Sequence, residues 1–106
     1  MRSDSGSRPV RKLLVRPAAA ADIEEAYLWY EKQRAGLGDE FLAAVDSLLG
    51  EIVAHPTAYQ AIHREVRRAL LRRFPYAVFF RLYGETVVIL ACMHGRRDPI
   101  RWKART

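Results

Sequence analysis

The chain has 106 residues, half of them apolar, and a formal net charge of +6. The composition excludes a disordered chain and the length suits one domain, so we predict a single domain over residues 10–106 after a disordered tail, residues 1–9. A single cysteine, Cys92, rules out an intrachain disulfide and is typical of a protein of the reducing cytoplasm. The N-terminal stretch lacks the apolar core of a signal peptide, and no apolar run approaches the roughly 20 residues of a membrane span. We therefore expect a cytoplasmic protein without a membrane partner.

The first half of the chain predicts a strand followed by two helices. A short apolar run within residues 10–17, ended by a proline, predicts the strand. Four apolar residues then lie at the spacing of one helix face, namely Ile23, Ala26, Tyr27 and Tyr30. Gly36 suits the C-terminal cap of this helix, and a second helix is expected from about Asp39 to His55. The short break between the two helices predicts an antiparallel helical hairpin.

The second half of the chain predicts a sheet. Residues 57–65 are expected to form a loop, after which the apolar pattern alternates with a period of two. A bend is predicted at Phe74–Tyr76 and a tight turn at Tyr83–Glu85, because proline and glycine interrupt strands there. The run Thr86–Met93 is apolar throughout, which is typical of a central strand covered on both faces.

The predicted fold class is therefore α+β, with the order β-α-α-β-β-β. The sheet is expected to be small and mostly antiparallel, with the helical hairpin packed on one of its faces. Alternation in the arginine-rich stretch RRALLRRFPYAVFFR, residues 67–81, predicts that Leu70, Val78 and Phe80 face the helices. The arginines would then occupy the other face of the sheet and the bend.

The charges are segregated along the chain. Residues 22–51 carry eight acids and two bases, and these acids, which are expected mostly on outward helix faces, are interpreted as solvating charge. Residues 64–106 carry eleven bases and three acids, a net charge of +8. Fifteen of the eighteen bases are arginine, whose planar guanidinium binds phosphate or carboxylate with two hydrogen bonds. The basic half is thus predicted to be a docking surface for an anion, with a plain solvated face as the alternative.

Motifs for metal, nucleotide or nucleophilic chemistry are weak. Gly36 and Gly38 precede a helix, but no strand leads into them and no lysine follows at the spacing of a phosphate-binding loop. Cys92 and His94 would share a strand face, yet a structural zinc site normally needs four ligands, and Cys92 is better interpreted as a small core residue. No serine, histidine and aspartate arrangement suggests itself. No metal or cofactor is predicted.

One cluster of basic residues remains as a candidate site, with His94 near its end. Arginine stabilises an anionic transition state of RNA cleavage, and histidine transfers protons near neutral pH. A ribonuclease site is therefore one interpretation of His94 beside arginines. The other is that His94 ends a strand and makes local hydrogen bonds.

Four stretches, taken together, make the sequence similar to a known family. They are DIEEAYLWYEKQRAGLGDEFL, HPTAY, VRRALLRRFPYAVFFRL and VVILACMHGRRDPIRW, in family order, and they cover almost everything from Leu13 to Trp102. On these residues the chain resembles the RelE/ParE superfamily of toxins from type II toxin–antitoxin systems. The family fold, a small antiparallel sheet carrying a helical hairpin, agrees with the order of elements above.

The resemblance implies a bacterial growth inhibitor that a cognate antitoxin neutralises by wrapping around it. RelE-like members cleave mRNA on the ribosome, whereas ParE-like members poison DNA gyrase and have no known hydrolytic site. In this chain no tyrosine follows Tyr83 and Trp102 cannot supply a phenol, so only His94 is left for acid–base chemistry. This lack, and the pattern FPYxVxF…HxRRDPxxW, favour the ParE-like branch.

Two sets of site residues follow. For a ribonuclease, the catalytic residues would be His94, Arg68, Arg72 and Arg96. The surface that binds the target or the antitoxin is predicted to comprise Arg67, Arg68, Arg72, Arg73, Arg81, Arg96, Arg97 and Trp102. The expected partners are the antitoxin, in a hetero-oligomer, and either DNA gyrase or the ribosome with its mRNA. A plain nucleic-acid-binding module is the third hypothesis, motivated by the basic second half.

Overall fold

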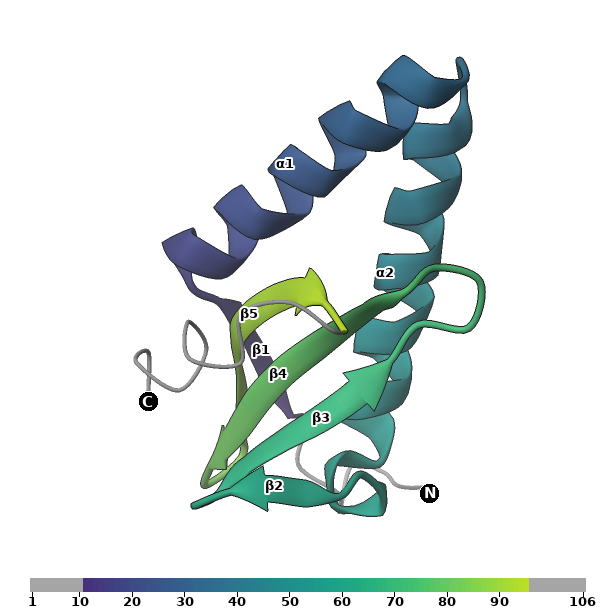
Figure 1. Cartoon of the computed structure of the whole chain (residues 1–106). Helices are drawn as coiled ribbons and strands as arrows, with labels where there is room; N and C mark the ends of the chain where they lie inside the picture. The colour runs from purple at the N-terminus through teal and green to yellow at the C-terminus, as the bar shows by residue number, and fades with distance from the viewer. Residues whose placement is uncertain (1–10, 96–106) are drawn as a thin grey trace, which may run out of the picture.

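A computed structural model describes residues 11–95 as an α+β fold, which confirms the predicted class (Figure 1). Two helices, α1 (Pro17–Gln33) and α2 (Leu37–Ala54), form the hairpin and cover one face of a sheet. The sheet has five strands: β1 (Lys12–Val15), β2 (Ala61–His63), β3 (Val66–Leu70), β4 (Tyr76–Tyr83) and β5 (Thr86–His94). The segment predicted as a loop over residues 57–65 contains β2, preceded by the short helical turn η1 (Pro56–Ala58).

The strands lie in the order β1-β5-β4-β3-β2. The first strand, β1, pairs with β5 in parallel, and the other three pairings are antiparallel. This places β5 between β1 and β4, and every residue from Val87 to Met93 is buried. The prediction of a central strand covered on both faces is confirmed. It follows from an apolar run that no polar residue interrupts.

A bulge interrupts the pairing of β4 with β5. Phe79 lies opposite Ala91, whereas the next residue, Phe80, lies opposite Ile89, so Leu90 is the extra residue. Both Leu90 and Ala91 belong to the apolar cluster on the face away from the helices. Consequently Ile89 and Cys92, three positions apart, both pack on the helix side. The bulge thus reverses the alternation of side chains in the last part of β5.

Two apolar layers hold the sheet. The layer under the helices contains Phe41, Val45 and Ile52 of α2 against Val78 and Phe80 of β4. The layer on the other face is smaller: Val66, Ala77, Phe79, Val88, Leu90, Ala91 and Met93, with Ile62 packed against it. The fold therefore buries apolar side chains on both sides of the sheet, although the described helices cover only one side.

The predicted orientation of the arginine-rich stretch is partly wrong. Val78 and Phe80 do face the helices, but Leu70 pairs with Ala77 of the opposite layer and is 61% exposed. Arg67 pairs with Phe80 and therefore lies on the helix side, where its guanidinium donates a hydrogen bond of 2.6 Å to the carbonyl of Tyr59. The prediction placed Leu70 in phase with Val78, but the register pairs Ala69 with Val78 instead.

The turn between the helices depends on glycine and on one carboxylate. Gly36 has φ of +89°, a left-handed conformation that favours glycine. It lies at the N-cap of α2, whereas Arg34 is the C-cap of α1, so the predicted role of Gly36 as the C-terminal cap of the first helix is wrong. The Glu31 carboxylate accepts the backbone N–H groups of Gly36 and Gly38, both at 2.9 Å, at the start of α2. It thereby satisfies N–H donors that a helix leaves unpaired at its N-terminus. No helix among the described residues is long and apolar enough to cross a membrane.

Candidate functional site

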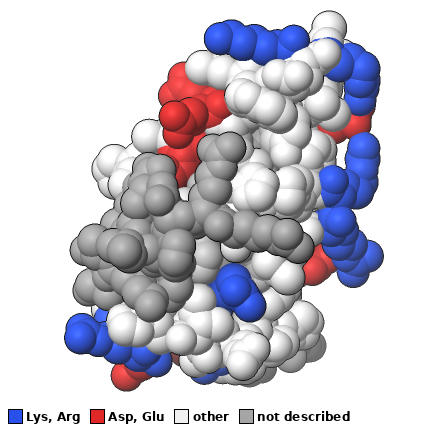
Figure 2. Space-filling model, viewed as in Figure 1, with Lys and Arg blue, Asp and Glu red and all other residues white. Residues whose placement is uncertain are grey.

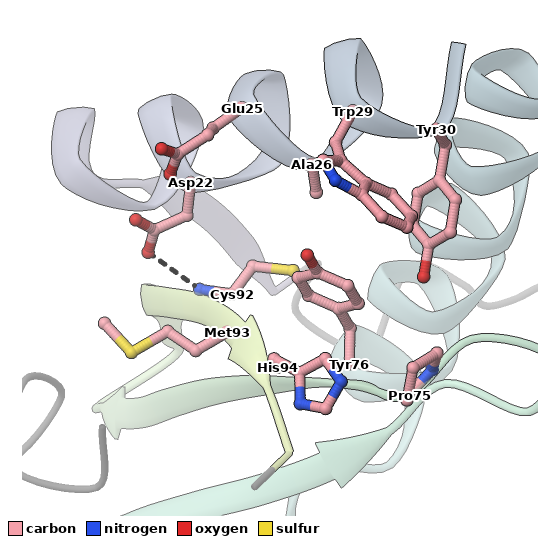
Figure 3. Close-up of a pocket in the computed structure, with 10 residues that line it drawn as sticks. All are labelled: Asp22, Glu25, Ala26, Trp29, Tyr30, Pro75, Tyr76, Cys92, Met93 and His94. Carbon is pink, nitrogen blue, oxygen red and sulfur yellow. Dashed lines mark hydrogen bonds between the residues drawn. The ribbon is translucent and has the colours of Figure 1, made fainter. Parts of the chain in front are cut away.

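A pocket of about 320 Å³ opens between α1 and the adjoining ends of β4 and β5 (Figure 3). Of the residues that the structure describes, ten line it: Asp22, Glu25, Ala26, Trp29, Tyr30, Pro75, Tyr76, Cys92, Met93 and His94. Of these, only His94 was singled out from the sequence as a candidate site residue with a chemical role. The helical spacing of α1 projects Asp22, Ala26 and Trp29 toward the sheet, and the hairpin of β4 and β5 brings Tyr76 opposite His94.

Aromatic rings form one wall of the pocket. Trp29 contacts Tyr30 with ring centroids 5.1 Å apart, Tyr30 contacts Tyr76 at 6.0 Å, and Tyr76 contacts the His94 ring at 5.6 Å. All three contacts are edge-to-face, the arrangement that aromatic quadrupoles prefer. Burial, followed by the nearby Tyr76 and Cys92, raises the pKa of Tyr30 above its ordinary value. Its hydroxyl is therefore a neutral donor and acceptor at neutral pH.

Carboxylates form the other wall. Asp22 is only 8% exposed, and its Oδ2 accepts the backbone N–H of Cys92 at 3.1 Å (Figure 3). Glu25 lies one turn further along α1 and is exposed. The interpretation of the acids in residues 22–51 as solvating charge is thus wrong for Asp22. The sequence did contain one signal for the burial of Asp22, because Asp22 lies four residues before Ala26 and therefore on the apolar face of α1.

Cys92 is a core residue, as predicted. Burial, followed by the neighbouring Asp22, raises the pKa of its thiol to about 12. The thiol therefore stays protonated and is a poor metal ligand or nucleophile. Within residues 11–95, no group of three or more histidine, cysteine or acidic side chains is placed to hold a metal ion.

The residues of the ribonuclease hypothesis are not brought together where the structure describes them. His94 packs against Tyr76 on the helix side of the sheet. Arg68 pairs with Phe79 and lies on the opposite side. Arg72 lies in the exposed loop between β3 and β4. A catalytic site needs its acid, base and phosphate-binding groups within hydrogen-bond reach of one substrate, and the sheet itself separates His94 from Arg68. Arg96, the fourth residue of this set, lies outside the described residues.

The other predicted arginines are spread over several places. Arg73 donates to Glu40 at 2.8 Å, and Arg81 lies 3.7 Å from Glu65 with its guanidinium over the ring of Tyr83. Arg97 and Trp102 lie outside the described residues. Figure 2 shows acidic side chains gathered over α1 and basic side chains along the edge from the α1–α2 turn to the β3–β4 loop. The described arginines thus form a basic edge and separate surface groups, not one cluster.

Glu40 joins the two ends of that basic edge. Its carboxylate accepts Arg34 at 3.2 Å and Arg73 at 2.8 Å, so it links the α1–α2 turn to the β3–β4 loop. The hydrogen bond from Arg73, followed by the one from Arg34, lowers the pKa of Glu40. The Glu40 carboxylate thus orients two exposed guanidinium groups on the surface.

Comparison with known proteins decides the family. The model of the ParE toxin of type II toxin–antitoxin systems, parDE, matches residues 13–99. The chain belongs to the ParE toxin family. Toxin ParE2 of Mycobacterium tuberculosis, from strains CDC 1551 and H37Rv, is 30% identical over 90 residues, which cover 84% of this chain and 86% of the relative. This match confirms the superfamily resemblance and the ParE side of it.

A solved structure supports the same assignment for this ParE family member. The chain is similar to one in the chromosomal ParDE TA system from P. aeruginosa, with a TM-score of 0.63 and 25% identity. The similarity covers 80% of this chain and 96% of the other. Nearly the whole of that chain therefore has a counterpart here.

Proposed function

We propose that this ParE family toxin inhibits bacterial growth in the cytoplasm by poisoning DNA gyrase, and that a cognate antitoxin neutralises it by direct binding. The proposal rests on membership of the ParE toxin family over residues 13–99. One structural observation supports a mechanism by contact rather than by hydrolysis. His94 and Arg68, the candidate acid–base group and a candidate phosphate ligand, lie on opposite faces of the sheet.

The decisive experiment measures gyrase directly. Purified toxin added to gyrase and supercoiled plasmid should accumulate linear DNA in covalent cleavage complexes, visible on a gel after detergent and protease treatment. Antitoxin added first should prevent this. Normal supercoiling at a large excess of toxin over gyrase would contradict the gyrase target.

The ribonuclease alternative is tested with the same preparation. His94 is the acid–base residue of the ribonuclease hypothesis. If the toxin acts by contact, it needs no such group, so His94→Ala should leave gyrase poisoning intact. Cleavage of mRNA in a translation extract by the wild type, abolished in His94→Ala, would instead favour the RelE-like mechanism. A second variant, His55→Ala, provides a matched control, since His55 is exposed at the C-terminal end of α2, away from the pocket.

We further propose that the exposed arginines near the β3–β4 loop contact acidic residues of the antitoxin. Arg72 and Arg73 are both exposed, and the Glu40 carboxylate holds Arg73 in place. Charges at an interface act mainly on the association rate and its salt dependence. Arg72→Gln should therefore slow association with the antitoxin and flatten its salt dependence, whereas Arg64→Gln, exposed beyond β2, should not.

A further inference from the structure

The described part of the pocket wall beside α1 has a charge opposite to that of the chain as a whole. The chain carries a net charge of +6, yet the wall residues within the described range 11–95 include two carboxylates, Asp22 and Glu25, and neither lysine nor arginine. Acidic side chains also gather on the surface over α1 (Figure 2). The carboxylates of this described wall attract a cation, which the basic edge would repel.

The uncharged walls of the pocket also suit a cation. Trp29 is 55% exposed at its mouth, and the rings of Tyr30 and Tyr76 line its interior. An ammonium or guanidinium group over an aromatic face is attracted by the ring quadrupole, and tryptophan gives the strongest attraction. The hydrocarbon stem of a long basic side chain would meanwhile contact Ala26 and the aromatic rings. The carboxylates and the aromatic rings thus favour the same ligand, a long side chain that ends in a cation.

We propose that this pocket receives one lysine or arginine side chain of the antitoxin. The inference rests on the proposed neutralisation by an antitoxin, and it assigns one anchor of that contact. The volume of about 320 Å³ is at the small end of ligand pockets, which suits a single side chain of a protein better than a large free ligand. An antitoxin segment that covers both this pocket and the basic edge would need basic and acidic residues at separate positions.

The binding partner is tested with paired charge-neutral variants on α1. Glu25→Gln removes one carboxylate of the pocket, and Glu24→Gln removes the adjacent exposed carboxylate, which is not part of the pocket wall. Calorimetric titration with the antitoxin encoded beside the toxin should show affinity about tenfold weaker for Glu25→Gln, as expected for loss of a charge pair at an interface. Glu24→Gln should bind within twofold of the wild type. Trp29→Ala should weaken binding as well.

A second titration identifies which lysine or arginine of the antitoxin binds in the pocket. Each lysine and arginine of the antitoxin is replaced by glutamine in turn and titrated against the wild type and against Glu25→Gln. One replacement should weaken binding to the wild type but have little further effect on Glu25→Gln, which is the signature of a coupled pair.

Three results would overturn the proposal, and they separate it from the proposed function. If Glu25→Gln binds the antitoxin as tightly as the wild type does, the proposed contact in the pocket is contradicted, whereas antitoxin binding itself is not. A loss of thermal stability in free Glu25→Gln with unchanged antitoxin affinity would assign the pocket to this chain's own basic residues. Absence of any binding between wild-type toxin and antitoxin would overturn both the anchor and the neutralisation on which it rests.

Discussion

The buried carboxylate of Asp22 accepts the backbone N–H of Cys92, 70 residues away in the sequence, and so joins α1 to the central strand. Cys92 follows directly after the bulge residues Leu90 and Ala91, in a part of β5 that lies beyond the reach of the short strand β1. The side chain of a helix residue thus provides an acceptor for this strand N–H. This contact also fixes one wall of the pocket.

Removal of this acceptor should destabilise the fold. Asp22→Ala leaves the buried N–H of Cys92 without this partner, and an unsatisfied buried donor costs about 1–3 kcal/mol. Asp22→Asn, which retains a side-chain carbonyl, should cost less. The free energy of unfolding from urea denaturation measures both, with the exposed Asp46→Ala on α2 as the control. Equal stability of Asp22→Ala and the wild type would contradict a structural role for this hydrogen bond.

Two glycines of α2 should respond to alanine in opposite directions. A Cβ on Gly38 would lie 2.6 Å from Cδ1 of Tyr27 and 2.8 Å from Oε1 of Glu31, so Gly38→Ala must displace the ring or the carboxylate. Overpacking of this kind costs about 1–3 kcal/mol. A Cβ on Gly50 would meet nothing within 4 Å, so Gly50→Ala should stabilise the helix by about 0.5–1 kcal/mol. Thermal denaturation of the two variants is the measurement.

The Glu31 carboxylate should matter about as much as a helix cap. It accepts the N–H groups of Gly36 and Gly38 in the role that Ser, Thr or Asp takes at many helix starts. Glu31→Ala should cost about 1 kcal/mol of unfolding free energy, within the range of cap deletions. Glu24→Ala, on the exposed face of the same helix, is the control in the urea titration. A cost no larger than that of Glu24→Ala would show that water replaces the carboxylate.

The Glu40 bridge predicts a pH dependence. Its pKa is lowered by Arg73 and then by Arg34, so the folded state binds this proton less readily than the unfolded state does. The stabilisation is therefore present above the ordinary pKa of 4.5 and is lost as the pH falls through the lowered value in the fold. The difference in melting temperature between the wild type and Glu40→Gln should be visible at pH 7 and disappear in acid. High salt should reduce it, because the bridge is exposed.

Cys92 should be chemically silent in the folded protein. Its pKa of about 12 keeps the thiol protonated at pH 8, and its side chain is buried. Iodoacetamide should therefore label the native chain far more slowly than the urea-unfolded chain, as mass spectrometry would show. Rapid labelling of the native chain would mean that the central strand opens readily.

The sequence predicted the order and type of the elements because strong periodic signals carried them. The apolar stripes of α1 and α2, the glycines between them and the uninterrupted run of β5 each pointed to one structure. Two features escaped prediction for physical reasons. The strand β2 has only three residues, too few for a period, and the bulge at Leu90 depends on which residues of β4 pair with it. The predicted orientation of Leu70 was wrong for the same reason, because the register between β3 and β4 depends on tertiary pairing and not on either strand alone.

The candidate site was predicted less well. The arginines were predicted as the site because charged residues can be recognised directly in a sequence. A pocket, in contrast, forms only when elements that are distant in sequence come together. Tyr30 and Tyr76 have the pattern of core residues, and the fold does bury much of both, yet both also line the same pocket as Asp22. His94 was predicted as a candidate, and the structure places it in the pocket, but its neighbour there is Tyr76 and not Arg68.

The pairing of β1 with β5 has a consequence for synthesis of the chain. The strand β5, which ends at His94, is the last strand of the described sheet in chain order, and both β1 and β4 pair with it. A nascent chain thus has both helices but no complete sheet until β5 has left the ribosome. Non-local pairing of this kind delays folding until late in translation. The complete sheet surface therefore forms only after β5 has been synthesised, well after the two helices.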